Sequence, residues 1–196
     1  MQISSSTDTE RNLAIELILE DIPGGGVVEN DDFPTSSSGM KAGAYLGVDS
    51  SGIYHITKTA RMAAASPSSG TPSHSLMVYD NHEFKVGDYV QNTSKTASGC
   101  LITAIGASGT SVNVITLASS MSVTVAASGI IIQAATGDEY GLAFLYSPVA
   151  VSTNSFSLSD ENTGCGLLVR GRVRKSEMPY GTDSTLEALL PLIRFV

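Results

Sequence analysis

Apolar residues follow a glycine in three similar stretches of the chain. The stretches are KAGAYLG at residues 41–47, FKVGDYV at residues 84–90 and ASGIII at residues 127–132. A glycine at such a point lets the backbone bend into a strand without a Cβ clash. The apolar run that follows can cover a core, and this pattern is typical of the corners of small barrels and sandwiches. The pattern therefore predicts a mainly β fold, a small β-barrel or sandwich.

Short apolar runs separated by turn residues extend this prediction along the chain. Residues 49–52 (DSSG) and 106–110 (GASGT) are typical of hairpin turns, and residues 63–73 form a loop rich in Ala, Ser and Pro. The strands that we expect lie at residues 45–48, 53–59, 75–79, 87–92, 100–105, 111–117, 121–126, 129–134, 140–151, 153–158 and 165–174.

Residues 1–39 differ from the rest and predict an acidic N-terminal arm that ends in a hinge. Four apolar residues of this arm alternate with other residues, which favours a strand over a helix; they are Leu13, Ile15, Leu17 and Leu19. A proline, three consecutive glycines and a serine run follow them and predict a loop. We therefore divide the chain into this arm and a β-rich body at residues 40–196.

The C-terminal end of the body predicts one short helix near residues 184–190. Asp183 or Ser184 can cap its N-terminus, Glu187 stands where a capping box needs it, and Pro191 stops it. Residues 192–196 (LIRFV) are unusually apolar for a chain end. They either close the protein's own core as a last strand or dock into a neighbouring subunit.

Charge is low in total and uneven in placement. Charged residues make up 15% of the chain, and the net charge is −8. Residues 1–34 hold eight acidic residues and a single arginine, so almost the whole imbalance lies there. A broad basic face is missing, which argues against nucleic-acid binding. No stretch reaches the ~20 apolar residues that cross a bilayer, and the polar, acidic start is unlike a signal peptide. We expect a protein made in the cytoplasm and without a membrane partner.

Three arginines gather on one face of the last predicted long strand. The period of two in residues 169–174 (VRGRVR) places Arg170, Arg172 and Arg174 together. Like charges so close repel each other unless a partner neutralises them. Acidic residues of segment 1–34, from the same chain or a neighbour, are candidates for this role, and a solvated strand face is the alternative.

The sequence contains no pattern that indicates catalysis. The three histidines, His55, His74 and His82, do not stand in a zinc motif. No nucleophile elbow, P-loop or dinucleotide fingerprint is present. Cys100 and Cys165 are expected to be buried apolar residues. We therefore expect no enzyme activity, no cofactor and no metal.

Some of these stretches resemble known phage proteins. Residues 41–56 (KAGAYLGVDSSGIYHI), and residues 84–90 with the strands that continue to residue 135, resemble the small β module of tailed-phage head decoration proteins. Residues 169–195 look like the ending of head auxiliary or head-fibre proteins of crAss-like and related phages. The resemblance implies a non-enzymatic homo-oligomer, often a trimer, that binds the major capsid protein on the outside of the virion.

These observations lead to one hypothesis and two alternatives. We expect a capsid decoration protein that stabilises the major capsid protein lattice. The alternatives are a head-fibre or receptor- or glycan-binding module, and a hydrolase whose cleft would hold a perturbed acid or histidine. The residues expected to contact the capsid or a neighbouring subunit are Leu13, Ile15, Leu17, Leu19, Arg170, Arg172, Arg174, Ile193 and Phe195.

Overall fold

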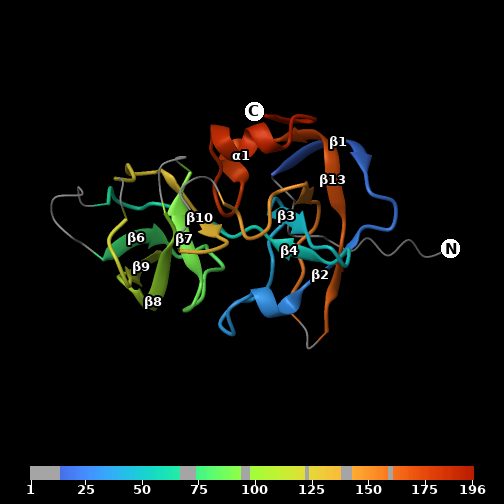
Figure 1. Cartoon of the computed structure of the whole chain (residues 1–196). Helices are drawn as coiled ribbons and strands as arrows, with labels where there is room; N and C mark the ends of the chain where they lie inside the picture. The colour runs from blue at the N-terminus through green and yellow to red at the C-terminus, as the bar shows by residue number, and fades with distance from the viewer. Residues whose placement is uncertain (1–13, 67–73, 94–97, 122–123, 138–142, 159–160) are drawn as a thin grey trace.

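The chain folds into two curled β-sheets that lie side by side, with one short helix near the C-terminus (Figure 1). The computed structural model describes residues 14–66, 74–93, 98–121, 124–137, 143–158 and 161–196. The mainly β fold class predicted from the sequence is confirmed.

The larger sheet combines strands from both ends of the chain. Its strands follow the order β1-β13-β11-β3-β4-β2-β12, and β14 runs parallel to the end of β13. The bounds are β1 Ile15–Asp21, β2 Gly26–Val28, β3 Tyr45–Val48, β4 Tyr54–Ile56, β11 Ala150–Ser152, β12 Thr163–Cys165, β13 Leu167–Val173 and β14 Ile193–Phe195.

The smaller sheet is built from one continuous stretch of sequence. Its order is β5-β10-β7-β8-β9-β6. An isolated bridge between Met62 and Val78 joins the region after β5 to β6, so the two ends of the sheet curl toward each other. The bounds are β5 Thr59–Arg61, β6 Ser75–Tyr79, β7 Tyr89–Asn92, β8 Cys100–Ala107, β9 Val112–Leu117 and β10 Ile130–Ala134.

Short helical turns complete the fold. The 3₁₀ turns η1 (Asn30–Asp32) and η2 (Lys175–Glu177) follow β2 and β13, and the helix α1 spans Ser184–Leu189. The Asp183 carboxylate accepts hydrogen bonds from the backbone N–H groups of Thr185 and Leu186, both at 3.0 Å. The predicted N-cap is thereby confirmed, because these donors have no partner inside the helix.

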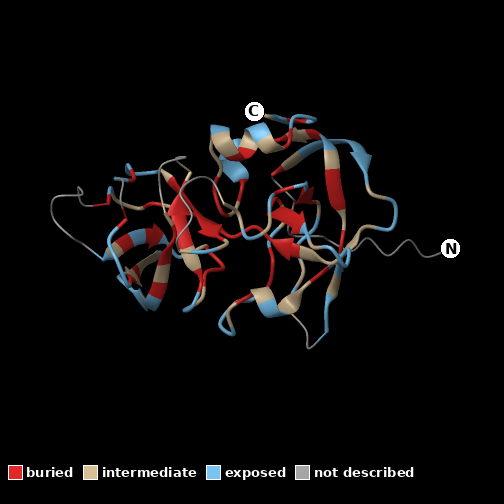
Figure 2. Ribbon diagram, in the orientation of Figure 1, coloured by how far each residue is buried: buried red, intermediate tan, exposed pale blue. Residues whose placement is uncertain are grey.

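Three apolar clusters form the core, and one of them joins the two sheets. One cluster fills the smaller sheet and a second fills the larger sheet. The third, which we call the joint cluster, combines Ile130 and Ile132 of β10 with residues of β3, β11, β13, β14 and α1. Buried segments meet in the middle of the molecule, between the sheets (Figure 2). Leu186 of α1 is fully buried there and covers the joint.

The three glycine stretches form turns directly before strands, as predicted. Gly43 and Gly87 have φ values of +91° and +99°, which residues with a Cβ rarely adopt. In the third stretch the positive φ falls on Ser128, at 64°, instead of on Gly129. The predicted hairpin turns at 49–52 and 106–110 are also present, between β3 and β4 and between β8 and β9.

Several predicted strands are wrong in extent. Residues 53–59 split into β4 and β5, which belong to different sheets. The Thr57 N–H donates to a carbonyl of the larger sheet, whereas the Lys58 carbonyl accepts from Gln133 of the smaller one, so the chain crosses between sheets here. Within 140–151 only β11 is a strand among the described residues, and in 153–158 Phe156 makes a single bridge to Met40. The described part of 121–126 is a loop, held by two hydrogen bonds between Ser66 and Val125.

Both strands in the described part of the predicted N-terminal arm belong to the larger sheet. β1 pairs with β13, and β2 pairs with β4 and β12. Gly24 and Gly25 lie in the turn between β1 and β2 and have φ values of +81° and +69°, and Gly26 begins β2. A Cβ on Gly25 would lie 2.3 Å from the Cys165 carbonyl oxygen, so the turn packs tightly against β12.

The joint cluster predicts the effect of a truncation in α1. Leu186→Ala removes a fully buried side chain and is expected to lower the free energy of unfolding by about 2–5 kcal/mol. Leu192→Ala, at a residue that is 62% exposed, should change it by less than about 0.5 kcal/mol. Urea unfolding monitored by circular dichroism measures both. Equal effects of the two substitutions would contradict the role given to α1.

Candidate functional site

The first candidate site is the edge of the larger sheet that β1 forms, at the opposite end of the strand order from β12. β1 pairs with β13 on one side, and no other described strand lies along its outer side. Its side chains are largely exposed: Leu17 by 44% and Leu19 by 61%. Unpaired N–H and C=O groups on an edge strand can accept a further strand, and natural proteins usually protect such edges. This exposed edge strand of seven residues, four of them apolar, is therefore a candidate docking surface.

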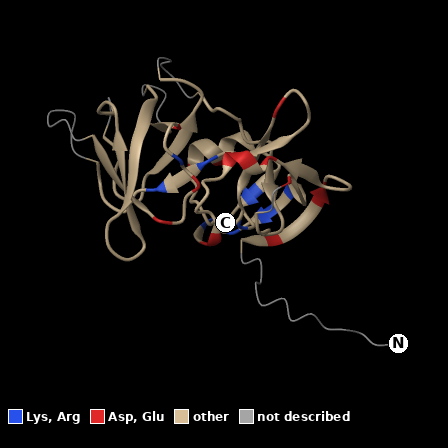
Figure 3. Ribbon diagram, turned by 90° about the horizontal axis from the view of Figure 1, so that it is seen from below, with Lys and Arg blue, Asp and Glu red and all other residues tan. Residues whose placement is uncertain are grey.

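The arginines of β13 lie beside the acidic residues of β1. The Arg172 guanidinium stands 3.6 Å from the Glu16 carboxylate, and Arg170 is opposite Glu20 in the register of the two strands. Basic positions of β13 adjoin acidic positions of the neighbouring strand in Figure 3. We expected acidic residues of segment 1–34, from the same chain or a neighbour, to face these arginines. For Arg172 the partner is Glu16 of the same chain. Both partners are about one-third exposed, so the ion pair contributes little to stability.

The remaining predicted contact residues have different surroundings. Ile193 is buried and Phe195 half-buried in β14, where the Phe195 ring centroid lies 6.2 Å from that of Tyr45. The C-terminal run therefore closes the protein's own core, the first of the two alternatives. Ile15 packs against the same joint cluster. Arg174 is exposed just after β13, and Leu13 lies outside the described residues.

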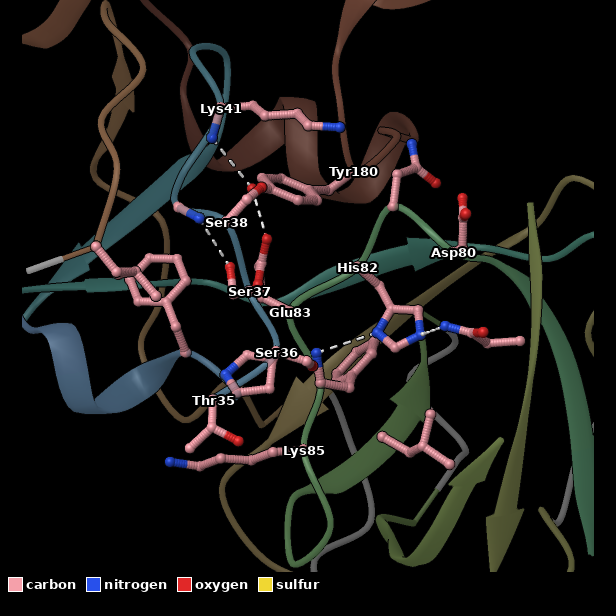
Figure 4. Close-up of a pocket in the computed structure, with 18 of the residues that line it drawn as sticks. Thr35, Ser36, Ser37, Ser38, Lys41, Asp80, His82, Glu83, Lys85 and Tyr180 are labelled. Atoms are coloured by element: carbon pink, nitrogen blue, oxygen red, sulfur yellow. Dashed lines mark hydrogen bonds between the residues drawn. The ribbon is translucent and has the colours of Figure 1, made fainter. Parts of the chain in front are cut away.

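The second candidate site is a cleft of about 1020 Å³ between the two sheets. It is lined by the segment that contains η1 and residues up to Lys41, by the β6–β7 connection, and by Tyr180 (Figure 4). Lys41 and Lys85 are found at opposite ends of the view, with Glu83 and His82 between them. The sequence did not predict His82 or Glu83 as site residues, because the segments that line the cleft are far apart in the chain.

Tyr180 and Glu83 form the polar wall of the cleft. The Tyr180 hydroxyl donates to the Glu83 carboxylate at 3.1 Å and accepts from the Lys41 backbone N–H at 3.2 Å. Glu83 is only 7% exposed. Its burial raises the pKa of the carboxyl, although hydrogen bonds from Ser37 and Tyr180 oppose this shift. The Thr59 hydroxyl donates to the Tyr180 carbonyl at 3.0 Å and ties this wall to the smaller sheet.

His82 occupies the inner end of the cleft as a neutral ring. Its Nδ1 accepts the Phe84 backbone N–H at 3.2 Å, and its Nε2 lies 3.1 Å from the Asn113 side-chain amide. Burial lowers the pKa of His82 to about 4. Both ring nitrogens are thus engaged within the protein, and the ring is uncharged at neutral pH.

His55 is held between two carboxylates outside the cleft. Its Nδ1 lies 2.9 Å from Asp32 and its Nε2 lies 3.7 Å from Asp49, while the ring stacks on Tyr146 at a centroid distance of 3.8 Å. Burial raises the pKa of Asp32, against the influence of His55. A nucleophile activated by histidine would place a hydroxyl or thiol at the second nitrogen. Here that nitrogen faces a carboxylate, so the group links η1 to β4 and its hairpin.

A buried ion pair lies where the chain crosses between the sheets. Lys58, 1% exposed, donates from Nζ to the Asp88 carboxylate at 2.8 Å, and Asp88 is 6% exposed. Sequence reasoning missed this pair, because an isolated lysine between two Thr residues gives no signal of burial. Among the described residues no group of three or more His, Cys, Asp or Glu side chains is arranged to hold a metal ion.

The comparisons with known proteins identify no relative. No family model, no curated protein and no solved structure matches the chain. In the part of the chain that the structure describes, no helix is long and apolar enough to cross a membrane. Both cysteines are buried as free thiols, as expected.

The surroundings of His82 predict a pH dependence of stability. The unfolded histidine binds a proton below its ordinary pKa of 6.5, whereas the folded one does so only near 4. The contribution of His82 to the free energy of unfolding is therefore fully present above pH 6.5. It is lost as the pH falls toward 4, and the total loss is on the order of 3 kcal/mol.

A pair of variants measures this contribution. The free energy of unfolding from urea titrations at pH 7 and pH 4.5 should fall less in His82→Gln than in the natural protein. His74→Gln, at an exposed histidine, should leave the difference unchanged. An undiminished pH dependence in His82→Gln would refute the assignment.

Proposed function

We propose that this protein is a structural component of a phage particle that binds the outer surface of the capsid and stabilises the major capsid protein lattice. The observation that carries the proposal is the open, apolar edge of β1. This edge offers a physical means of attachment. The second support is the sequence resemblance to head decoration and head auxiliary proteins, which covers residues 41–56, 84–135 and 169–195.

The edge of β1 suits attachment to a repetitive surface. A strand or loop of a capsid subunit can pair along the outer side of this strand and cover Leu17 and Leu19. Each buried apolar Å² contributes roughly 25 cal/mol to such an interface. Weak individual contacts become strong when copies bind together, so we also propose that the chain acts as a homo-oligomer, such as a trimer, on the symmetric shell.

The proposal is non-enzymatic. A hydrolase would use a cleft acid or histidine with a perturbed pKa, and Glu83 and His82 both have one. Their polar atoms, however, bond to Tyr180, Phe84 and Asn113. A general base needs a free lone pair within reach of the substrate proton, so we favour a structural role for these groups.

A head-fibre or glycan-binding module is the second candidate, and the cleft favours it. Amide, carboxylate and hydroxyl groups of Asn81, Glu83 and Tyr180 line it together with the ring of Phe33. Polar groups combined with an aromatic ring are the features by which a concave site recognises a polyhydroxylated ligand.

Charged substitutions on β1 test the main proposal. Leu17→Lys combined with Leu19→Lys is expected to weaken binding to empty capsid shells at least about tenfold, which corresponds to roughly 1.4 kcal/mol. Both side chains are already exposed, so the fold should persist. Met77→Lys on β6, where the side chain is 41% exposed, is the matched control on the other sheet. Cosedimentation with shells measures binding, and full binding by the double variant would contradict the proposal.

The cleft variant Lys41→Ala separates the two candidates. If the cleft binds a saccharide, a glycan array should give a signal that falls in Lys41→Ala and persists in the β1 double variant. If the protein is a decoration protein, Lys41→Ala should bind shells normally. Binding to neither shells nor glycans would exclude both functions.

A further inference from the structure

The Lys58–Asp88 pair is more completely buried than the other ion pairs among the described residues. Its Nζ–Oδ2 distance is 2.8 Å, and the side chains are 1% and 6% exposed. The Lys175–Glu187 pair has a similar distance, 2.7 Å, but its side chains are 46% and 18% exposed. Two charges in such a dry environment lose most of their hydration, which is costly unless their mutual attraction and further hydrogen bonds compensate for it.

The Asp88 carboxyl is held by two further donors, one on each oxygen. The Lys85 backbone N–H donates to Oδ2 at 2.9 Å, and the Gln133 side-chain amide donates to Oδ1 at 3.1 Å. Gln133 is itself buried. Fixed donors on both oxygens withdraw electron density from Cγ and are oriented to stabilise negative charge that develops on Oδ1.

The amine has the properties of a nucleophile. Burial lowers the pKa of Lys58, against the opposing effect of Asp88, and thereby increases the share of free amine. The hydrogen bond already holds Nζ against the carboxyl group, so attack on Cγ needs only a small movement. Such proximity replaces an encounter between separate molecules with an intramolecular step.

We propose that Lys58 and Asp88 condense to an intramolecular isopeptide bond. The Lys58 ammonium first passes a proton to Asp88 across their hydrogen bond, which gives an amine and a carboxylic acid. Nζ then forms a bond to Cγ, and the oxyanion on Oδ1 accepts the hydrogen bond of Gln133. A proton moves from Nζ to the Oδ2 hydroxyl, the Cγ–Oδ2 bond breaks, and one water molecule leaves.

The step is balanced without any other reactant. An amine and a carboxylic acid give an amide and water, and no atom is oxidised or reduced. The product replaces two desolvated charges by a neutral amide, whose burial costs less. The released water leaves for the bulk solvent. Because the site is dry, little water is present there to hydrolyse the amide again.

The bond would tie the crossing between the sheets to the start of β7. It would close the loop from residue 58 to residue 88, and a cross-link of this kind restricts the unfolded chain. This inference stands on the pair alone and does not depend on the proposed function.

Mass spectrometry of the intact, denatured protein tests the inference directly. The expected mass is lower than the sequence mass by one water molecule, and a tryptic digest should contain a branched peptide that joins residues 58 and 88. Lys58→Arg and Asp88→Ala should restore the full mass for their sequences. Gln133→Leu should leave a larger fraction without the bond.

Lys175→Met is the matched control, because it removes the exposed pair of similar distance. It should keep the loss of one water. A folded natural protein with the full sequence mass would overturn the inference, and so would a water loss that persists in Lys58→Arg. The mass and the branched peptide of the natural protein decide the matter even if a variant does not fold.

Discussion

The two sheets depend on one shared apolar cluster for their relative position. Ile130 and Ile132 of the smaller sheet contact residues of β13, β14 and α1 in the joint cluster, so neither sheet can complete its packing alone. Tyr180 adds polar links from this junction to Thr59, Lys41 and Glu83. Because the sheets meet along only part of their length, a cleft of about 1020 Å³ remains beside the contact. The joint and the cleft are thus two results of the same packing.

Local features of the fold could be predicted from the sequence, and non-local ones could not. The hairpin at 49–52 and the Asp183 cap follow from residues close together in the chain. The strand at the C-terminus was one of two alternatives that the apolar run 192–196 left open, and its pairing with β13 decided between them. The break of 53–59 into two strands escaped prediction because β-branched residues that favour strands continue through Thr57 and Thr59. The hydrogen bonds of Thr57 and Lys58 nevertheless go to different sheets. Met121 and Val125 of the predicted strand 121–126 likewise lie in the core of the smaller sheet without belonging to a strand, and their apolar character alone did not distinguish the two cases.

The candidate sites also combine features that the sequence predicts with features that depend on tertiary contacts. The acidic excess of segment 1–34 predicted partners for the arginines, and Glu16 at Arg172 is one. That these groups lie in adjacent strands, with bulges in their register, depends on tertiary contacts that no local pattern encodes. The cleft is assembled from segments around residues 30–41, 80–86 and 180, so only the folded chain reveals it. Glu83 and His82 directly precede the glycine stretch at 84–90, and no other feature of the sequence indicated that they belong to a site.

The insertion of one sheet within the sequence of the other has a consequence for synthesis. All strands of the smaller sheet come from residues 59–134, whereas β1 near the beginning of the chain pairs with β13, which starts at residue 167. A growing polypeptide can therefore complete the smaller sheet while the larger one still waits for β13, which pairs with β1, β11 and β14. Closing that long loop costs entropy before any contact repays it. Until then β1 has no partner strand, and its apolar residues add to the risk of premature association of the nascent chain.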